Sequence, residues 1–364
     1  MEIPKELKDI SWQIDEPTYR ADPALSYSTL ARYEREGFNK LDHLFDKIST
    51  QSLLEGSMVD CLITGSQEEF NELYYVADFP SIGDKEKLAA QELIDRYSNS
   101  CELFSYIPHN AILEVLNEIG WQKNWRDDTR VRVISERAAM YYNLVVQAGN
   151  KTVVDRNTYD RIIKMVQTLK TSPATQGYFA DNDPISPVRR YYQLKFKARF
   201  KGVNYRCMAD LIIVDYEDKK IIPVDLKTSG HHEWDFQESF LQWKYLVQSM
   251  LYWRIIKANL MQDSYFKDFT LENYRFIVVN KESLTPLVWE FPLTKMVGTL
   301  VDKEGKEYRD PFEIGKELQG YLNLRPRVPN GIDIDGVNTI DCLKLKEEVQ
   351  KDSLDSILDA PWRQ

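Results

Sequence analysis

The feature that most constrains this sequence is a run of three strand-like segments between residues 190 and 228, the first of which alternates strictly. Within "YYQLKFKARF", apolar residues from Tyr192 to Phe200 alternate with Gln193, Lys195, Lys197 and Arg199. This period of two is typical of a half-buried β-strand. "YRCMADLIIVDY" and "IIPVDLKT" indicate two further strands, and "KGVN" and "EDKK" between them fit tight turns. The run therefore predicts an antiparallel meander of three strands.

Helical periodicity surrounds this meander. Residues 26–65 indicate two helices, the second ending near Gly65, and residues 84–180 are mostly helical in pattern. A long helix is expected over about 236–258, followed by the strands "YRFIVVNKE" and "PLVWEFP". We expect one mixed α/β domain at residues 26–292, with a helical insertion at about 84–180. An irregular arm is expected at 1–25 and a helical appendage at 293–364.

Composition excludes several classes of protein. The chain has 364 residues, enough for a full core, and its four cysteines are scattered without a C-x-x-C pair. Neither a zinc knuckle nor a disulfide framework is therefore expected. No apolar run is long enough to span a membrane, and the first residues lack the order of a signal peptide, so a cytoplasmic protein without membrane contact is expected.

Charge leaves one place for contact with nucleic acid. The net charge of −10 argues against a protein that coats nucleic acid through its overall field. Between Ile185 and Ala209, however, there are seven Lys or Arg and no Asp or Glu. A solvated strand edge protected by lysines and a local nucleic-acid contact both explain this segment.

The predicted third strand carries two charges in an apolar run. Side chains alternate along a strand, so Asp225 and Lys227 emerge on one face while Leu226 points to the other. Asp210 interrupts the preceding strand and can lie near Asp225 if the two strands pair in simple register. Two neighbouring carboxylates in a poorly solvated site need a proton or a cation, and oxygen ligands suit Mg²⁺ or Mn²⁺. Strand-end aspartates with one ion pair to Lys227 are the competing interpretation.

The helix after this strand adds two polar side chains. Gln248 and Tyr252 are four residues apart in "FLQWKYLVQSMLYWRII", so they lie on one helical face. A polar residue beside an aromatic one is also common on ordinary amphipathic helices.

Taken in order, these motifs resemble the PD-(D/E)XK nuclease superfamily, and its RecB-like branch in particular. The resemblance rests on Asp210, the D-x-K of Asp225 and Lys227, and Q-x-x-x-Y on the next helix. An upstream G-x-x-x-D places Asp60 four residues after Gly56, where that branch has His or Glu. "SYSTLARY", "CMADLI", "VDLKTSG" and "QSMLYW" are together similar to RecE-type exonucleases over about residues 26–290.

The resemblance implies a fold and a set of roles. The fold is a restriction-endonuclease-like core, in which a central mixed sheet with an antiparallel meander is flanked by helices. Asp60, Asp210, Asp225 and the carbonyl of Leu226 would bind Mg²⁺ or Mn²⁺. Lys227 would orient the attacking water and stabilise charge on the phosphate, and Gln248 and Tyr252 would position phosphate or nucleophile. Asp60 departs from the usual residue, and its shorter reach can alter the metal spacing.

The implied activity is metal-dependent hydrolysis of duplex DNA ends for recombination or DNA processing. Such enzymes commonly form homo-oligomeric rings and work with a single-strand annealing or recombination partner. The basic segment would then line the DNA path through Arg189, Arg190, Lys195, Lys197 and Arg199. The carboxy-terminal "LDSILDAPWRQ" is either a docking segment for such a partner or a solvated tail.

Two other functions have to be compared with a metal-dependent exonuclease. The iron–sulfur branch of the same nucleases needs three cysteines near the end of the core, and only Cys342 follows Cys207. That branch does not fit. A catalytically inactive DNA-binding or interaction protein that retains the fold stays open.

Overall fold

The structure is a computed structural model that describes residues 5–46, 48, 50–293 and 300–324. The chain divides into two compact units, Met1–Lys316 and Glu317–Gln364. All elements that concern the candidate site belong to the first unit. Of the second unit the structure describes 317–324, which form the end of helix α11 (Pro311–Leu324).

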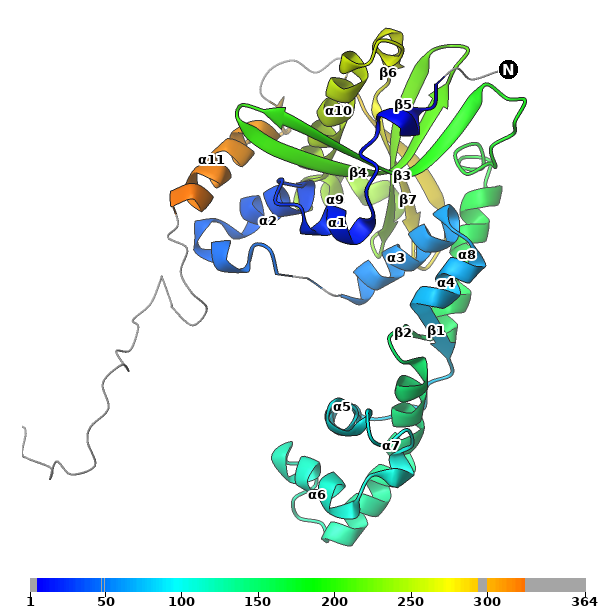
Figure 1. Ribbon diagram of the computed structural model, residues 1–364, viewed down its shortest axis with the longest axis vertical. Helices are drawn as coiled ribbons and strands as arrows, with labels where there is room; N and C mark the ends of the chain where they lie inside the picture. The colour runs from blue at the N-terminus through cyan, green and yellow to red at the C-terminus, as the bar shows by residue number, and fades with distance from the viewer. Residues whose placement is uncertain (1–4, 47, 49, 294–299, 325–364) are drawn as a thin grey trace, which may run out of the picture. The chain divides into compact units, whose positions relative to one another are not determined.

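A six-stranded mixed sheet forms the centre of the first unit (Figure 1). Its order is β3-β4-β5-β7-β8, with the short β6 beside β5. β3, β4 and β5 pair antiparallel, β7 joins β5 in parallel, and β8 returns antiparallel to β7. The predicted meander and the predicted mixed sheet are both confirmed. The strands are β3 (Val188–Phe200), β4 (Val203–Asp215), β5 (Lys220–Ser229), β6 (Thr270–Leu271), β7 (Tyr274–Asn280) and β8 (Pro286–Phe291).

The first hairpin of the meander is a two-residue turn. Lys201 and Gly202 connect β3 to β4 with φ angles of 48° and 83°. Two successive positive φ angles match the right-handed twist of the flanking strands, and glycine takes the second position without steric strain. "KGVN" therefore sets the pairing register of the longest ladder in the sheet.

One face of the sheet packs on α3 (Gln51–Thr64) and α8 (Arg156–Thr171). A single apolar cluster joins Met58 and Val59 of α3 and Met165 of α8 to Leu211 and Val224 of the sheet. Because strand side chains alternate, the neighbours of Leu211 and Val224 in sequence point to the opposite face. That face packs on α10 (Tyr245–Gln262), which also contacts α2 (Tyr27–Glu36).

The order α3, β4, β5, α10 is the order of the motifs on which the resemblance rests. Parallel pairing of β5 and β7 requires a crossover connection, and α9 (Phe236–Gln242) and α10 supply it. The fold is thus mixed α/β, with helices on both faces of the sheet.

A helical insertion separates α3 from α8 in sequence. It contains α4 (Gln67–Leu73), β1 (Tyr74–Ala77), α5 (Asp84–Tyr97), α6 (His109–Glu118), α7 (Asp127–Ala148) and β2 (Thr152–Asp155). β1 and β2 pair in parallel, and α5, α6 and α7 enclose an apolar cluster of their own. The mostly helical pattern expected for 84–180 is confirmed.

Two local expectations were wrong. The amino-terminal arm is not irregular, because it contains α1 (Glu16–Ala21). Asp15 caps this helix with a side chain that accepts the Thr18 N–H, and Pro17 lies in its first turn. The helix expected over 236–258 is two helices, broken at Lys244, whose φ of 62° is left-handed.

The remaining described elements are short. They are the 3-10 helices Leu7–Ile10, Phe38–His43, Phe104–Tyr106, Glu233–Asp235 and Phe266–Asp268, and the strands β9 (Leu300–Val301) and β10 (Glu307–Tyr308). Cys342 and "LDSILDAPWRQ" lie outside the described residues. In the part of the chain that the structure describes, no helix has both the length and the apolar character that crossing a membrane requires.

Candidate active site

The candidate site begins where two strands of the sheet separate. The β4–β5 ladder runs from Asp215 and Lys220 to Leu211 and Val224 and stops there. Asp210 is the next residue of β4, and its Oδ2 accepts the backbone N–H of Leu226 at 3.0 Å. A side chain thus replaces the backbone acceptor that the ladder no longer supplies. The predicted simple register is confirmed, and it places Asp210 and Asp225 at the same end of the sheet.

Asp225 is buried on the α10 face of β5, with 1% of its surface exposed. Its Oδ1 accepts from Gln248 Nε2 at 2.5 Å, and Lys227 Nζ lies 2.5 Å from its Oδ2. The sequence predicts that Asp225 and Lys227 share a face and that the next helix carries a polar partner. The structure brings all three side chains together.

Two tyrosines surround the Lys227 ammonium. Its Nζ lies 4.8 Å from the centre of the Tyr245 ring, and the Tyr27 ring lies 6.3 Å from that of Tyr245. Burial is the largest single effect and lowers the pKa of Lys227, but the charge of Asp225 together with Tyr245, Asp210 and Tyr27 raises it by more. The pKa of Lys227 therefore lies above its usual range, and the side chain is a cation at neutral pH.

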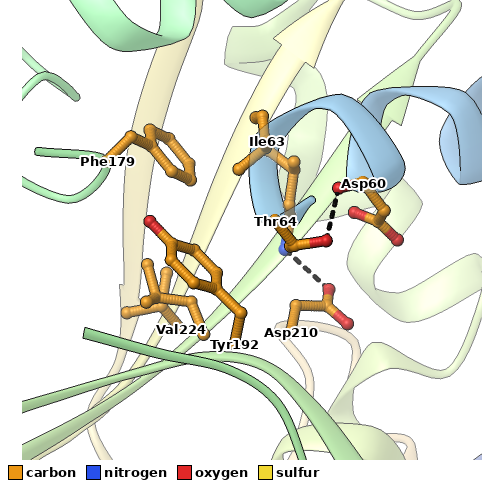
Figure 2. Close-up of a pocket in the computed structure, with 9 residues that line it drawn as sticks. Asp60, Ile63, Thr64, Phe179, Tyr192, Asp210 and Val224 are labelled. Carbon is orange, nitrogen blue, oxygen red and sulfur yellow. Dashed lines mark hydrogen bonds between the residues drawn. The ribbon is translucent and has the colours of Figure 1, made fainter. Parts of the chain in front are cut away.

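Helix α3 delivers Asp60 to the same region. A Cβ at Gly56 would meet Thr228 Oγ1 of β5 at 3.7 Å, so the helix lies close to the strand one turn before Asp60. Figure 2 shows Asp60 and Asp210 at one pocket, which Ile63, Thr64, Phe179, Tyr192, Leu211, Val224 and Leu226 also line. The Thr64 hydroxyl donates to the backbone carbonyl of Asp60 at 2.8 Å, as the dashed line between these two residues in Figure 2 marks.

The carboxyl groups repel one another in this poorly solvated site. Burial, and then the charge of Asp225, raises the pKa of Asp60 to about 7. Burial, Asp225 and Asp60 in that order raise the pKa of Asp210 well above its usual range. The single ammonium of Lys227 does not offset these effects. The site therefore favours a proton or an additional cation on Asp60 and Asp210.

The donor chemistry fits a hard divalent cation, since the candidate ligands are all oxygens. The Leu226 carbonyl joins them because the N–H and C=O of one residue in an extended strand point to the same side, here toward Asp210. The positions of the candidate side chains fit a metal ion less well than their chemistry does. Within the described residues no group of three His, Cys, Asp or Glu side chains converges as a metal-binding set. Asp225 is instead held by Lys227 and Gln248.

Tyr252 lies one helical turn beyond Gln248 and is buried. Burial raises its pKa well above the usual range, with smaller contributions from Tyr19, Cys207 and Asp225. Tyr252 is therefore a buried side chain, and its predicted role in positioning phosphate stays a prediction.

The basic residues predicted to line a DNA path make contacts within the chain. Lys195 Nζ donates to the Ile14 carbonyl at 2.9 Å, and Lys197 Nζ lies 2.7 Å from Asp22 Oδ2. Both side chains thus hold the amino-terminal arm.

The three arginines of this set bind backbone carbonyls. Arg189 donates to Asp183 at 2.7 Å, Arg190 to Gly177 at 2.6 Å, and Arg199 to Gly202 at 3.3 Å. Arg199 is the exposed member. Contact of any of the five with DNA stays a prediction.

Sequence reasoning missed three tyrosines near Asp225. Tyr27 donates to the Trp243 carbonyl at 2.7 Å, Tyr245 lies under Lys227, and Tyr274 of β7 is fully buried. Tyr245 could have been found, because it lies three residues before Gln248 and so on the same helical face. Tyr27 and Tyr274 come from elements distant in sequence, and periodicity gives no signal for them.

Comparisons with known proteins add little. No family model matches the chain, and no curated protein matches it. Among solved structures, a crystal structure at 2.19 Å resolution is similar; its protein comes from Eubacterium rectale and is proposed to be an exonuclease. The two share 10% identity over 86% of each chain, with a TM-score of 0.41. A likeness of this size carries no inference about the present chain.

Proposed function

We propose that the protein is a divalent-metal-dependent deoxyribonuclease that hydrolyses phosphodiester bonds at the ends of duplex DNA. One observation carries the proposal. Asp225 and Lys227 form an ion pair on β5, Gln248 of α10 holds the same carboxylate, and Asp210 binds the backbone of Leu226 between them. Phosphodiester hydrolysis requires an activated water and stabilisation of the negative charge that develops on the phosphate, and an acidic pair that can hold a metal ion beside a buried cation suits both needs.

Asp60, Asp210, Asp225 and the Leu226 carbonyl would hold Mg²⁺ or Mn²⁺. The cation, when bound, would activate water and neutralise negative charge on the phosphate. The raised pKa values of Asp60 and Asp210 support this proposal, because binding of a cation relieves the repulsion among the carboxylates.

Lys227 would act as a fixed positive charge beside the scissile phosphate. Its raised pKa argues against a role as general base, since a base must give up its proton near neutral pH. Tyr245 limits the positions of the ammonium through its ring face, and Gln248 fixes the Asp225 carboxylate that holds it. These contacts would orient the charge before substrate arrives.

The finer parts of the proposal come from the resemblance to RecE-type exonucleases. They are a preference for duplex ends, a homo-oligomer that encloses DNA, and an annealing or recombination partner. The test is incubation with end-labelled linear and circular DNA in Mg²⁺, Mn²⁺ or EDTA. We expect metal-dependent loss of label from linear DNA and intact circles. Nicked circles would show that the protein is an endonuclease rather than an exonuclease. Absence of cleavage of either DNA would overturn the proposal.

An inactive DNA-binding scaffold is the second candidate. It is favoured by the spacing of the described His, Cys, Asp and Glu side chains, which form no three-membered metal-binding group. Titration calorimetry with Mn²⁺ separates the two candidates. The enzyme is expected to bind Mn²⁺ stoichiometrically, with weaker binding in Asp210→Asn, whereas a scaffold would show no saturable site.

A further inference from the structure

Three polar atoms on the buried side of the site have no hydrogen-bond partner among the described residues. They are Asp225 Oδ2, Gln248 Oε1 and the Tyr274 hydroxyl. Lys227 is close to Asp225 Oδ2, but that ion pair lacks the geometry of a hydrogen bond. The exposed fractions of Asp225, Gln248 and Tyr274 are 1%, 4% and 0%. Buried polar groups in native proteins are nearly always paired, so Gln248 Oε1 and the Tyr274 hydroxyl each require a partner, and Asp225 Oδ2 can accept a hydrogen bond in addition to its ion pair.

The three atoms belong to one neighbourhood. Gln248 Nε2 donates to Asp225, and because an ionised carboxylate only accepts, the amide oxygen of Gln248 must face away from it. Phe276 of β7 lies opposite Asp225 of β5, and Tyr274 precedes Phe276 by two residues on the same face. After burial, the charge of Asp225 is the largest cause that raises the pKa of Tyr274.

We propose that one buried water molecule joins Tyr274, Gln248 and Asp225. The water accepts a hydrogen bond from the Tyr274 hydroxyl and donates its two hydrogens to Gln248 Oε1 and Asp225 Oδ2. One donor and two acceptors lack partners, and one water supplies one acceptor and two donors. Three hydrogen bonds are also the usual number for a buried water.

Tyr274 is then a positioning residue for Asp225. The water fixes the second carboxylate oxygen, while Gln248 Nε2 fixes the first. With both oxygens held from the interior, the carboxylate keeps its orientation toward the gap between β4 and β5. A tyrosine that only fills space would behave differently, because its hydroxyl would be a buried donor without a partner.

The direction in which Tyr274→Phe changes the melting temperature distinguishes a tyrosine that holds a water from one that only fills space. Tyr274→Phe keeps the ring and removes the hydroxyl, so loss of the water predicts a lower melting temperature than in the wild-type protein. An unchanged or raised melting temperature would overturn the proposal, because removal of an unsatisfied hydroxyl is neutral or stabilising. Tyr106→Phe serves as the control, since Tyr106 is 63% exposed and should leave the melting temperature unchanged.

A crystal structure of the full chain tests the water directly. We expect an ordered water within hydrogen-bond distance of all three atoms in the wild-type protein, and its loss in Tyr274→Phe. A Tyr274 hydroxyl that donates to a protein acceptor instead would refute the proposal.

The consequence for the site rests on the proposed function. Tyr274→Phe is expected to weaken Mn²⁺ binding roughly tenfold, as outer-shell changes do, without altering the KM for DNA. If the wild-type protein binds no Mn²⁺ and cleaves no DNA, the proposed function fails. The melting temperature and the crystal structure still decide the water site in that case.

Discussion

At the scale of single residues, the candidate site contains three carboxyl groups and one ammonium group, so negative charge exceeds positive charge when all are ionised. Asp225 has a cation and an amide donor, whereas Asp60 and Asp210 share the remaining repulsion. Alternation in the sequence was enough to predict that Asp225 and Lys227 face the same way. It could not predict Tyr274, because the hydrogen-bond requirement of Asp225 becomes visible only when β7 lies beside β5.

The raised pKa of Asp60 predicts a pH dependence in metal-free protein. Its pKa is 3.8 in the unfolded chain and about 7 in the fold, so the folded state binds more protons between these values. The contribution of Asp60 to the free energy of unfolding therefore falls as pH rises from 3.8 to about 7 and stays unfavourable above that. We expect Asp60→Asn to stabilise metal-free protein more at pH ~8 than at pH ~5.

Chemical denaturation in EDTA at the two pH values measures this difference. Asp160→Asn, at an exposed position of α8, is the control and should show the same effect at both pH values. An Asp60→Asn effect that does not change with pH would show that Asp60 is already solvated, and the electrostatic description of the pocket would be wrong.

At the scale of elements, the sequence predicted strands better than helix ends. β3 alternates apolar and polar residues, β4 and β5 follow it across two turn signals, and the register of β3 with β4 follows from "KGVN" at their hairpin. The break between α9 and α10 has no such signal in the sequence. The residue in the left-handed conformation there is Lys244, whereas glycine is the residue that usually marks such a position. The arm was misjudged for a similar reason, since α1 has only six residues and little periodicity.

The break at Lys244 leads to a stability prediction. A non-glycine residue in the left-handed region costs about 1–2 kcal/mol, and glycine removes that strain at a smaller entropic cost. We expect Lys244→Gly to raise the free energy of unfolding by about 0.5–1 kcal/mol. Lys257→Gly, in the middle of α10, should instead lower it by about 1 kcal/mol.

Urea denaturation of both variants compares the same substitution in two backbone conformations. Equal losses in the two variants would mean that the chain does not adopt the left-handed turn at Lys244. The separation of α9 from α10 would then have to be reconsidered.

At the scale of the whole molecule, the basic strand illustrates the limit of charge patterns. Seven Lys or Arg without a carboxylate between Ile185 and Ala209 suggested a surface for DNA. In the fold, Lys195 and Lys197 bind the arm, and the backbone N–H of Trp12 donates to the Lys195 carbonyl at 2.7 Å. The sequence could not show this, because the acidic partner Asp22 is distant along the chain.

Lys197 therefore has a predicted structural role that can be measured. Its Nζ lies 2.7 Å from Asp22 and 4.8 Å from the centre of the Trp12 ring. We expect Lys197→Ala to lower the free energy of unfolding by about 1 kcal/mol, and the exposed Arg199→Ala to change it by less than about 0.5 kcal/mol.

The same variant decides whether Lys197 also contacts DNA. If it binds a phosphate, the slope of log affinity against log salt concentration falls by about one unit in Lys197→Ala. An unchanged slope, together with the loss of stability, would restrict Lys197 to the arm and remove it from the predicted DNA path.

The most direct test of the central claim is the rate of nucleotide release from linear duplex DNA in Mg²⁺. Lys227→Ala is compared with Lys220→Ala, which removes an exposed lysine at the start of the same strand. If Lys227 is the fixed charge beside the scissile phosphate, its variant loses about 10²–10³-fold in rate while Lys220→Ala keeps the wild-type rate. Equal rates in wild-type protein and a folded Lys227→Ala variant would contradict the account.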